Sequence, residues 1–348
     1  MNQKSRDSNF ELFRILLIVM VISIHYFLHG GALKNLTPND TNYYVVNIIY
    51  SCIRVAVNCF VLISGYFGIK FRTQKLIKFE LQVLFYSISI FIIFVCAGIE
   101  EFNMIGLKLC LTPIMSREWW FITTYVLLYI ISPYINMVRD KLTKENYIKV
   151  LLIGLFFCII APTFRFNPLL TNRGFSLYNF IFLYLIGGYI RKYYNKNISK
   201  YKFLFSYIIF SGLTFYYNLL VNNIKNTVAY DYDSIFIFGA TISLTMFFKS
   251  IKLKSNIINS ISPMVFGIYL IHDHEYVRNF IYTQIFNTNK YYTSSVLLIN
   301  AIKTIGCIFL VCLIIEFIRL KIFGELENII AEKITDIYKL ILKKILYN

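Results

Sequence analysis

Three ionisable residues share one apolar stretch near the start of the chain. Glu11, Arg14 and His25 all lie within residues 10–28, a segment otherwise long and apolar enough to cross a membrane. Eleven residues at 100° each return to within about 20° of the starting direction, so Arg14 and His25 share a helix face, roughly 16 Å apart along the axis. Ionisable groups inside a membrane span are costly, so they predict a functional site facing the interior of a helix bundle.

These residue types suit two kinds of chemistry. An imidazole takes up and returns a proton near neutral pH, and a guanidinium binds phosphate groups or stabilises a developing oxyanion. On a helix that crosses the membrane, this pair fits group transfer from a phosphorylated donor to an acceptor. It fits proton movement by a transporter equally well, and the stripe alone leaves both functions open.

Other apolar segments hold further candidates. Arg54 lies near the middle of the second apolar segment, and His272 closes the ninth. Each intramembrane arginine needs an anionic partner. The chain offers few such partners in or beside its apolar segments, namely Glu11, Glu316, Asp273 and Glu275.

Two motifs can be interpreted either as part of a functional site or as purely structural. The pair Trp119–Trp120 could line a site, or it could anchor the chain at the membrane–water interface. Ser64, next to Gly65, could contact a ligand, or the pair could allow two helices to pack closely.

The composition indicates how these residues are held in place. The chain has 348 residues, of which 57% are hydrophobic and 15% charged, whereas soluble domains carry roughly 25% charged residues. We therefore expect an all-α, polytopic membrane bundle of about ten spans. They are placed near residues 10–30, 43–68, 79–98, 119–138, 149–166, 175–193, 203–222, 232–249, 257–273 and 294–319.

Charge and cysteine content exclude other classes of protein. Lysine and arginine gather in alternate loops, which places both termini in the cytoplasm and explains the net charge of +17 without nucleic-acid binding. The seven cysteines form no CxxC pair, so we expect neither a disulfide framework nor a zinc site, and we predict no metal site. Residues 1–323 are predicted to form the transmembrane domain, and 324–348 an amphipathic helix on the inner leaflet.

Four segments together resemble a known family. Glu11 and Arg14 followed by His25 resemble the opening helix of the bacterial integral-membrane acyltransferase family 3. Three later segments, 54–66, 119–133 and 262–272, are similar to the family's other motifs and occur in the same order. The resemblance implies transfer of an acyl group, usually acetyl, from cytoplasmic acetyl-coenzyme A to a hydroxyl of a cell-surface polysaccharide or other envelope glycan. It also implies a multi-pass protein of the bacterial plasma membrane.

The resemblance assigns roles by position. His25 would be the general base or a transient acyl carrier, and Arg14, braced by Glu11, would contact the phosphates of the donor. The remaining matched residues would bind substrate, namely Arg54, His272, Ser64, Trp119, Trp120 and Tyr269. No cofactor is expected to stay bound, because acetyl-coenzyme A is a donor substrate.

The partners expected beside the lipid bilayer are the acyl-coenzyme A and the glycan, with a homo-oligomer or an envelope-assembly protein as further partners. Some family members append an extracytoplasmic hydrolase-like domain, and we expect this chain to act without one or with a separate partner. The alternative function is a transporter that exports a glycan or couples proton movement. No internal half-repeat of the kind common in secondary transporters is evident.

Overall fold

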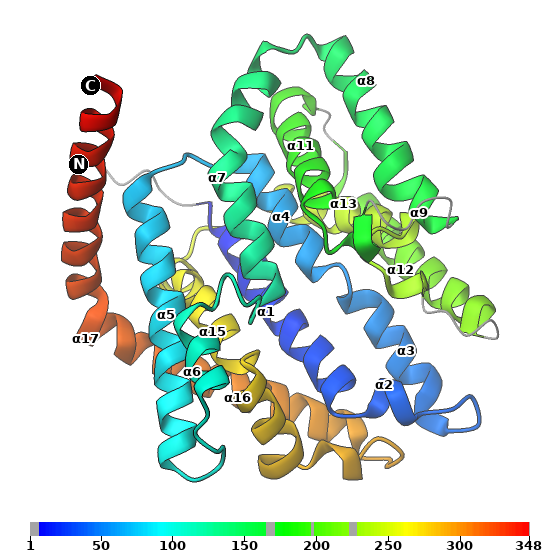
Figure 1. Ribbon diagram of the computed structural model, residues 1–348. Helices are drawn as coiled ribbons and strands as arrows, with labels where there is room; N and C mark the ends of the chain where they lie inside the picture. The colour runs from blue at the N-terminus through cyan, green and yellow to red at the C-terminus, as the bar shows by residue number, and fades with distance from the viewer. Residues whose placement is uncertain (1–6, 165–170, 196–197, 223–227, 348) are drawn as a thin grey trace.

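The computed structural model describes residues 7–164, 171–195, 198–222 and 228–347, and every regular element in these ranges is helical. The predicted all-α class is therefore confirmed for the described residues. Figure 1 shows the helices gathered into one bundle, with the short helices α2 (Ala32–Asn35), α6 (Met104–Leu111) and α16 (Glu275–Asn279) all in its lower half.

Seven segments among the described residues are long and apolar enough to cross a membrane, as expected of a multi-pass membrane protein. They comprise α1 (Ser8–His29), α3 with α4 (Thr41–Ile53 and Ala56–Phe67), α5 (Thr73–Cys96), α7 (Trp120–Lys141), α8 to α9 (Lys144–Leu155 and Ala161–Thr163, joined by the π-helical Phe156–Ile160), α12 (Lys200–Asn222) and α17 (Leu297–Tyr347).

The other three predicted spans are present as shorter helices. The segment 175–193 forms α11 (Leu177–Tyr193), and 232–249 forms α13 (Ile235–Lys249). The segment 257–273 is broken into α14 (Asn256–Ile261), a 3₁₀ turn (Ser262–Met264) and α15 (Val265–His272). Pro263 lies in that turn, where its missing N–H and its ring interrupt a continuous helix. A count of ten spans and the cytoplasmic location of the termini stay predictions.

The first helix lies at the centre of the bundle. α1 packs against α3, α4, α13, α14, α15 and α17, which come from the beginning, middle and end of the chain. Its apolar side chains are correspondingly buried, and Phe13, Leu17 and Ile22 have no exposed surface. A helix surrounded in this way must direct its polar stripe toward other helices, as the sequence predicted.

Two glycines let α4 and α11 approach at backbone distance. A Cβ on Gly65 would lie 2.1 Å from the carbonyl oxygen of Tyr184, and a Cβ on Gly187 would lie 2.2 Å from that of Leu62. The close-packing interpretation of Gly65 is therefore correct, because small residues permit such contact between membrane helices. This contact fixes α4, which also carries Ser64.

The last helix is tied to α5 by buried charges. Arg319 pairs with Glu316 at 2.8 Å and also with Glu327. Glu316 in turn accepts hydrogen bonds from Gln82 at 3.1 Å and Tyr86 at 2.5 Å. α17 passes without interruption through the predicted boundary at residue 324, although its ribbon turns sharply between its orange and red parts (Figure 1).

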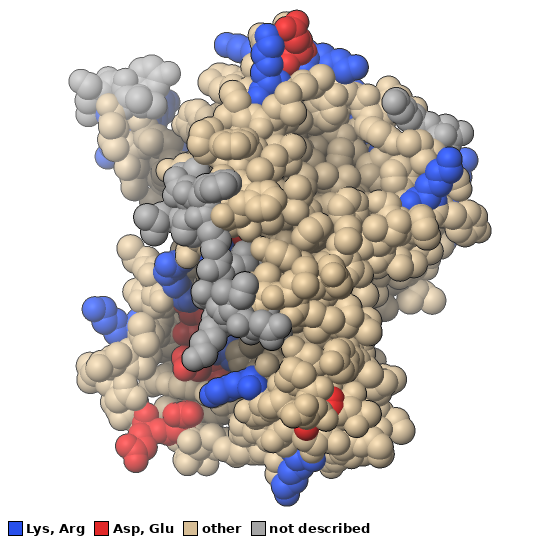
Figure 2. Space-filling model, turned by 90° about the vertical axis from the view of Figure 1, so that its right-hand side faces the viewer, with Lys and Arg blue, Asp and Glu red and all other residues tan. Residues whose placement is uncertain are grey.

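The surface is consistent with a lipid environment. Most of the face in Figure 2 carries no charged side chain, and the lysines, arginines and acidic residues that it shows lie mainly near its ends and edges. Large apolar side chains are exposed along several helices, among them Ile93 of α5, Ile153 of α8 and Ile302 of α17, with 60%, 61% and 74% of their surface exposed. In a membrane protein such side chains contact lipid tails.

The glycine contact generates a prediction about stability. Gly65→Ala should destabilise the protein by about 1–3 kcal/mol, because an added methyl group would force α4 and α11 apart. The matched control is Gly212→Ala in α12, where a Cβ would meet nothing within 4 Å. The measurement is the thermal unfolding midpoint in detergent. Equal midpoints for the two variants would contradict the close contact.

Candidate active site

One cavity of about 500 Å³ lies inside the bundle, within the range typical of ligand pockets. Both Arg14 and His25 line it, so the two residues predicted to share a face of α1 do face one space. Its other walls come from α4, α5, α7, the 3₁₀ turn at Ser262–Met264, α15 and Tyr232. Its lining side chains include Ser64, Lys75, Gln82, Trp120, Tyr125, Tyr232, Ser262 and Tyr269.

One end of the cavity is cationic. The cavity lining includes two cationic side chains, Arg14 and Lys75. Because Lys75 is also exposed to solvent, the cavity opens to the surface at this end. Arg14 donates to Glu11 at 2.6 Å, and Glu11 also accepts a hydrogen bond from the hydroxyl of Ser262. The glutamate therefore fixes the guanidinium between α1 and the 3₁₀ turn that precedes α15.

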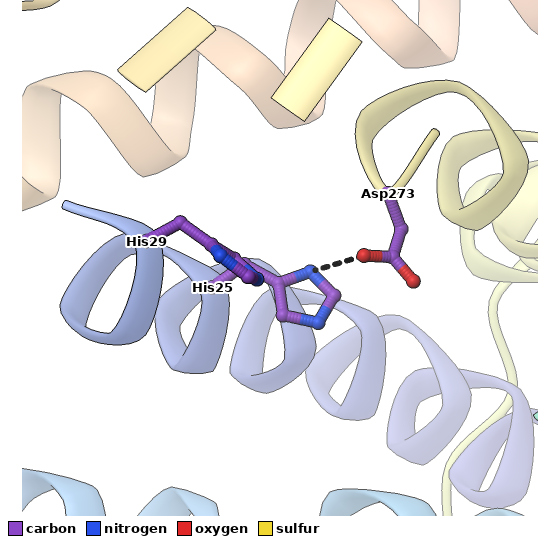
Figure 3. A group of neighbouring side chains, drawn as sticks. All are labelled: His25, His29 and Asp273. Carbon is purple, nitrogen blue, oxygen red and sulfur yellow. Dashed lines mark ion pairs between the residues drawn. The ribbon is translucent and has the colours of Figure 1, made fainter. Parts of the chain in front are cut away.

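His25 lies near the other end of α1, beside an acidic residue and a second histidine. Its Nδ1 is 3.1 Å from Nε2 of His272 and 3.4 Å from Oδ1 of Asp273. Asp273 Oδ1 also pairs with Nη1 of Arg278 at 3.1 Å. Figure 3 shows Nδ1 of His25 directed at Asp273, while the other ring nitrogen, Nε2, points away from it.

The hydrogen bonds define where the protons of this pair lie. Nδ1 of His272 is 2.7 Å from the carbonyl oxygen of Ile268, which can only accept, so this nitrogen carries the proton. Nε2 of a neutral His272 is then an acceptor, and Nδ1 of His25 must donate to it or to Asp273. His25 therefore keeps an unprotonated Nε2, which is the atom a general base needs.

The connecting segments that precede α7 and follow α15 contact each other. Glu118 accepts a hydrogen bond from the backbone N–H of Glu275 at 3.4 Å, and the rings of Trp119 and His274 are 5.5 Å apart. Burial, with Arg278 nearby, lowers the pKa of His274 to about 3, whereas burial raises the pKa of Glu118. His274 is therefore neutral at pH 7, and its 3.9 Å contact with Glu118 is not a pair of full charges.

Arg54 acts on the cavity wall rather than lining the cavity. It lies at the junction of α3 and α4 and donates to the carbonyl oxygen of Tyr230 and the hydroxyl of Tyr232, both at 2.7 Å. Its guanidinium also lies 3.8 Å from the centroid of the Tyr232 ring. Tyr232 lines the cavity, so Arg54 positions a lining residue that the sequence analysis did not identify.

The two tryptophans separate into different environments. Trp120 lines the cavity, and its ring lies 5.9 Å from that of Tyr232. Trp119 is 1% exposed and packs on His274. A role for Trp119 as an interfacial anchor is therefore excluded by its burial, since an interfacial ring must reach the headgroups.

The remaining predicted residues divide into lining and supporting positions. Ser64 and Tyr269 line the cavity, and Ser64 shares a 3.1 Å hydrogen bond with Tyr125. Glu11 supports Arg14, and His272, which is fully buried, contacts the site through His25. Asp273 was expected only as an anion in or beside the apolar segments, and Arg278 was not expected at the site. The position of Asp273 directly after His272 was the available signal.

The comparison with known proteins adds one finding. A family model described as an acyltransferase domain matches residues 7–317, which contain every side chain of the cavity described above. No curated protein and no solved structure matches the chain.

The proton arrangement predicts selective chemical modification. Diethyl pyrocarbonate attacks unprotonated imidazole nitrogens, so it should modify His25 at Nε2 faster than His272, whose two nitrogens both have partners. Peptide mass spectrometry over a time course measures both rates, and the buried His274 is the internal control. Modification of His272 at the rate of His25 would contradict the assignment.

Proposed function

This chain belongs to the acyltransferase family whose model spans residues 7–317, and from that premise we propose that it transfers an acetyl group from acetyl-coenzyme A to a hydroxyl of a cell-surface polysaccharide or another envelope glycan. The observation that carries the proposal is a single cavity lined by Arg14 toward one end and His25 toward the other. Donor phosphates and reacting atoms can therefore occupy the same space. The proposed location is the bacterial plasma membrane.

The cationic end suits the donor. Coenzyme A carries several phosphate charges, and Arg14 and Lys75 offer an anion-binding pair where the cavity opens. The rise along α1 from residue 14 to residue 25 is roughly 16 Å, a distance that an extended pantetheine arm can bridge. The nucleotide would then remain at the opening while the thioester carbonyl reaches His25.

The reaction needs one base that returns its proton. Nε2 of His25 removes the proton from the acceptor hydroxyl as the oxygen attacks the thioester carbon, which gives a tetrahedral oxyanion. Collapse of that intermediate breaks the carbon–sulfur bond, and the proton passes from His25 to the departing thiolate. Asp273, beside Nδ1, stabilises the imidazolium that exists between the two proton transfers.

Tyr232, which lines the cavity, offers a hydroxyl that could serve the oxyanion. Its oxygen already accepts a hydrogen bond from Arg54, so its own proton is left to donate. A guanidinium next to a phenol strengthens the phenol as a donor, because it favours negative charge on the oxygen. Arg54 would therefore contribute to catalysis through Tyr232 and would not touch the substrate itself.

The lining favours a small neutral acyl group. Many of the residues that line the cavity are apolar, among them Val21 and Ile24 of α1 and Val57 of α4. The lining cations Arg14 and Lys75 belong to the end opposite His25. A succinyl carboxylate placed against these apolar side chains would cost free energy, whereas an acetyl group carries no charge.

Aromatic side chains support a sugar acceptor. Trp120 and Tyr269 line the cavity, and the Tyr269 ring lies 6.0 Å from that of His272, which contacts His25. Ligand pockets combine aromatic walls with a few placed polar groups, an arrangement that fits the apolar face and the hydroxyls of a sugar ring.

The central prediction concerns the base. His25→Ala should reduce glycan acetylation by at least about 10²-fold, the lower bound for loss of a general base. A deletion strain complemented with wild type, His25→Ala or the matched control His274→Ala would be compared by NMR of purified envelope glycans. Acetyl signals should be lost only with His25→Ala, while membrane levels of all three proteins stay equal. Normal acetylation by His25→Ala would overturn the proposal.

A second prediction concerns the donor. Arg14→Ala should raise the apparent KM for acetyl-coenzyme A about tenfold, since a hydrogen bond to a charged group contributes roughly 1.5–3 kcal/mol. Thiol release by the purified protein in nanodiscs measures this effect. Arg117→Ala is the matched control because Arg117 is exposed and outside the cavity lining. An unchanged KM in Arg14→Ala would remove this residue from the donor site.

A further inference from the structure

We propose that His25, His29 and Asp273 form a binding site for Zn²⁺, and that metal bound there inhibits the acyl transfer. The binding itself depends only on the geometry of these side chains. The inhibitory consequence rests on the proposed function, in which His25 is the base.

The ligand atoms already lie close together. One atom from each of His25, His29 and Asp273 falls within 4.8 Å of both others, and Figure 3 shows the two histidines on one helix facing the carboxylate of the other segment. Ligands at about 2.0–2.1 Å from a tetrahedral zinc ion are roughly 3.4 Å apart. Nδ1 of His25 and Oδ1 of Asp273 are 3.4 Å apart, so their separation matches that of two ligands on one zinc ion.

The spacing of the histidines on α1 supports the assignment. His25 and His29 are four residues apart, so both side chains lie on one face of the helix, and their ring centroids are 5.4 Å apart. Two histidines at this spacing are a recurrent metal-binding pattern on helices. His29 is partly exposed, whereas Asp273 is buried, so an ion can enter from the side of His29.

His272 contacts His25 beside the three clustered ligands. Nε2 of His272 is 3.1 Å from Nδ1 of His25, and it has a lone pair because its Nδ1 donates to the carbonyl oxygen of Ile268. The ligand atoms that lie within 4.8 Å of one another belong to two imidazoles and one carboxylate. Such a set, with water in the fourth position, matches the ligand preferences of zinc.

Arg278 opposes the metal. Its guanidinium pairs with Oδ1 of Asp273 at 3.1 Å, the same oxygen that faces His25. The cation therefore competes for this ligand and repels a divalent ion. Removal of the Arg278 charge should therefore increase the affinity for the metal. A nonspecific surface site elsewhere would not respond to this substitution.

Metal binding would disable the base through its proton. A zinc ion on Nδ1 of His25 displaces the proton from that nitrogen, and a neutral imidazole must then carry its proton on Nε2. Nε2 is the atom proposed to accept the proton of the acceptor hydroxyl. The metal would thus block the reaction without occupying the donor end of the cavity.

Binding is tested on the purified full chain in nanodiscs, with Co²⁺ as the spectroscopic probe and no acyl donor present. Wild type should bind one Co²⁺ with the visible absorption of a tetrahedral site, and Zn²⁺ should displace it. His29→Ala should weaken Co²⁺ binding by at least about 10–100-fold, the loss known for second-sphere partners alone. Arg278→Gln should strengthen binding, and His274→Ala, the matched control, should leave it unchanged. No saturable Co²⁺ spectrum, or the same affinity in His29→Ala, would overturn the site.

Inhibition is tested separately on the acetyl-transfer assay. Zn²⁺ should inhibit wild type and should inhibit His29→Ala only at concentrations at least about tenfold higher. If His29→Ala loses Co²⁺ but the wild-type protein transfers no acyl group, the metal site stands and the proposed function fails. If acetylation requires His25 but His29 does not alter sensitivity to Zn²⁺, the function stands and the inhibitory site fails.

Discussion

The proposed chemistry depends on one hydrogen bond, from Nδ1 of His272 to the carbonyl oxygen of Ile268 at 2.7 Å. This bond decides which nitrogen of His272 carries the proton, and through His272 it decides the same for His25. Without it, the two imidazoles could exchange roles and Nε2 of His25 would not be reserved for the cavity. A single backbone carbonyl on α15 therefore prepares the proposed base.

The arginines inside the bundle find their partners in two ways. Arg14 and Arg319 each pair with a glutamate three residues earlier on the same helix, whereas Arg54 uses a carbonyl oxygen and the ring of Tyr232. Pairing within a helix requires no distant partner, so it neutralises charge wherever the bundle is apolar. Arg14 differs from Arg319 in one respect: it is only partly buried and borders the cavity, so its remaining donors can meet a ligand.

The sequence was sufficient for features that depend on helix periodicity. The common face of Arg14 and His25 follows from their eleven-residue spacing, and the structure places both in one cavity. Helix periodicity cannot predict contacts between segments that are distant in the sequence. Arg54 was expected to line the cavity, but its interactions with the 228–234 segment turn it away, and no local pattern encodes that contact. The expectation of no metal site rested on cysteine spacing alone, whereas the proposed metal ligands come from α1 and the residue after α15.

Gln82 gives the distal end of the chain a physical connection to catalysis. This side chain forms part of the cavity wall and also donates to Glu316, whose partner Arg319 is held by Glu327 in the second half of α17. A fusion tag, a proteolytic cut or a bound protein that displaces this half of α17 would leave Arg319 and Glu316 to repack. Repacking of Glu316 would shift Gln82 and so change the wall of the cavity. A tag or partner attached to the C-terminal half of α17 can therefore alter the shape of the cavity.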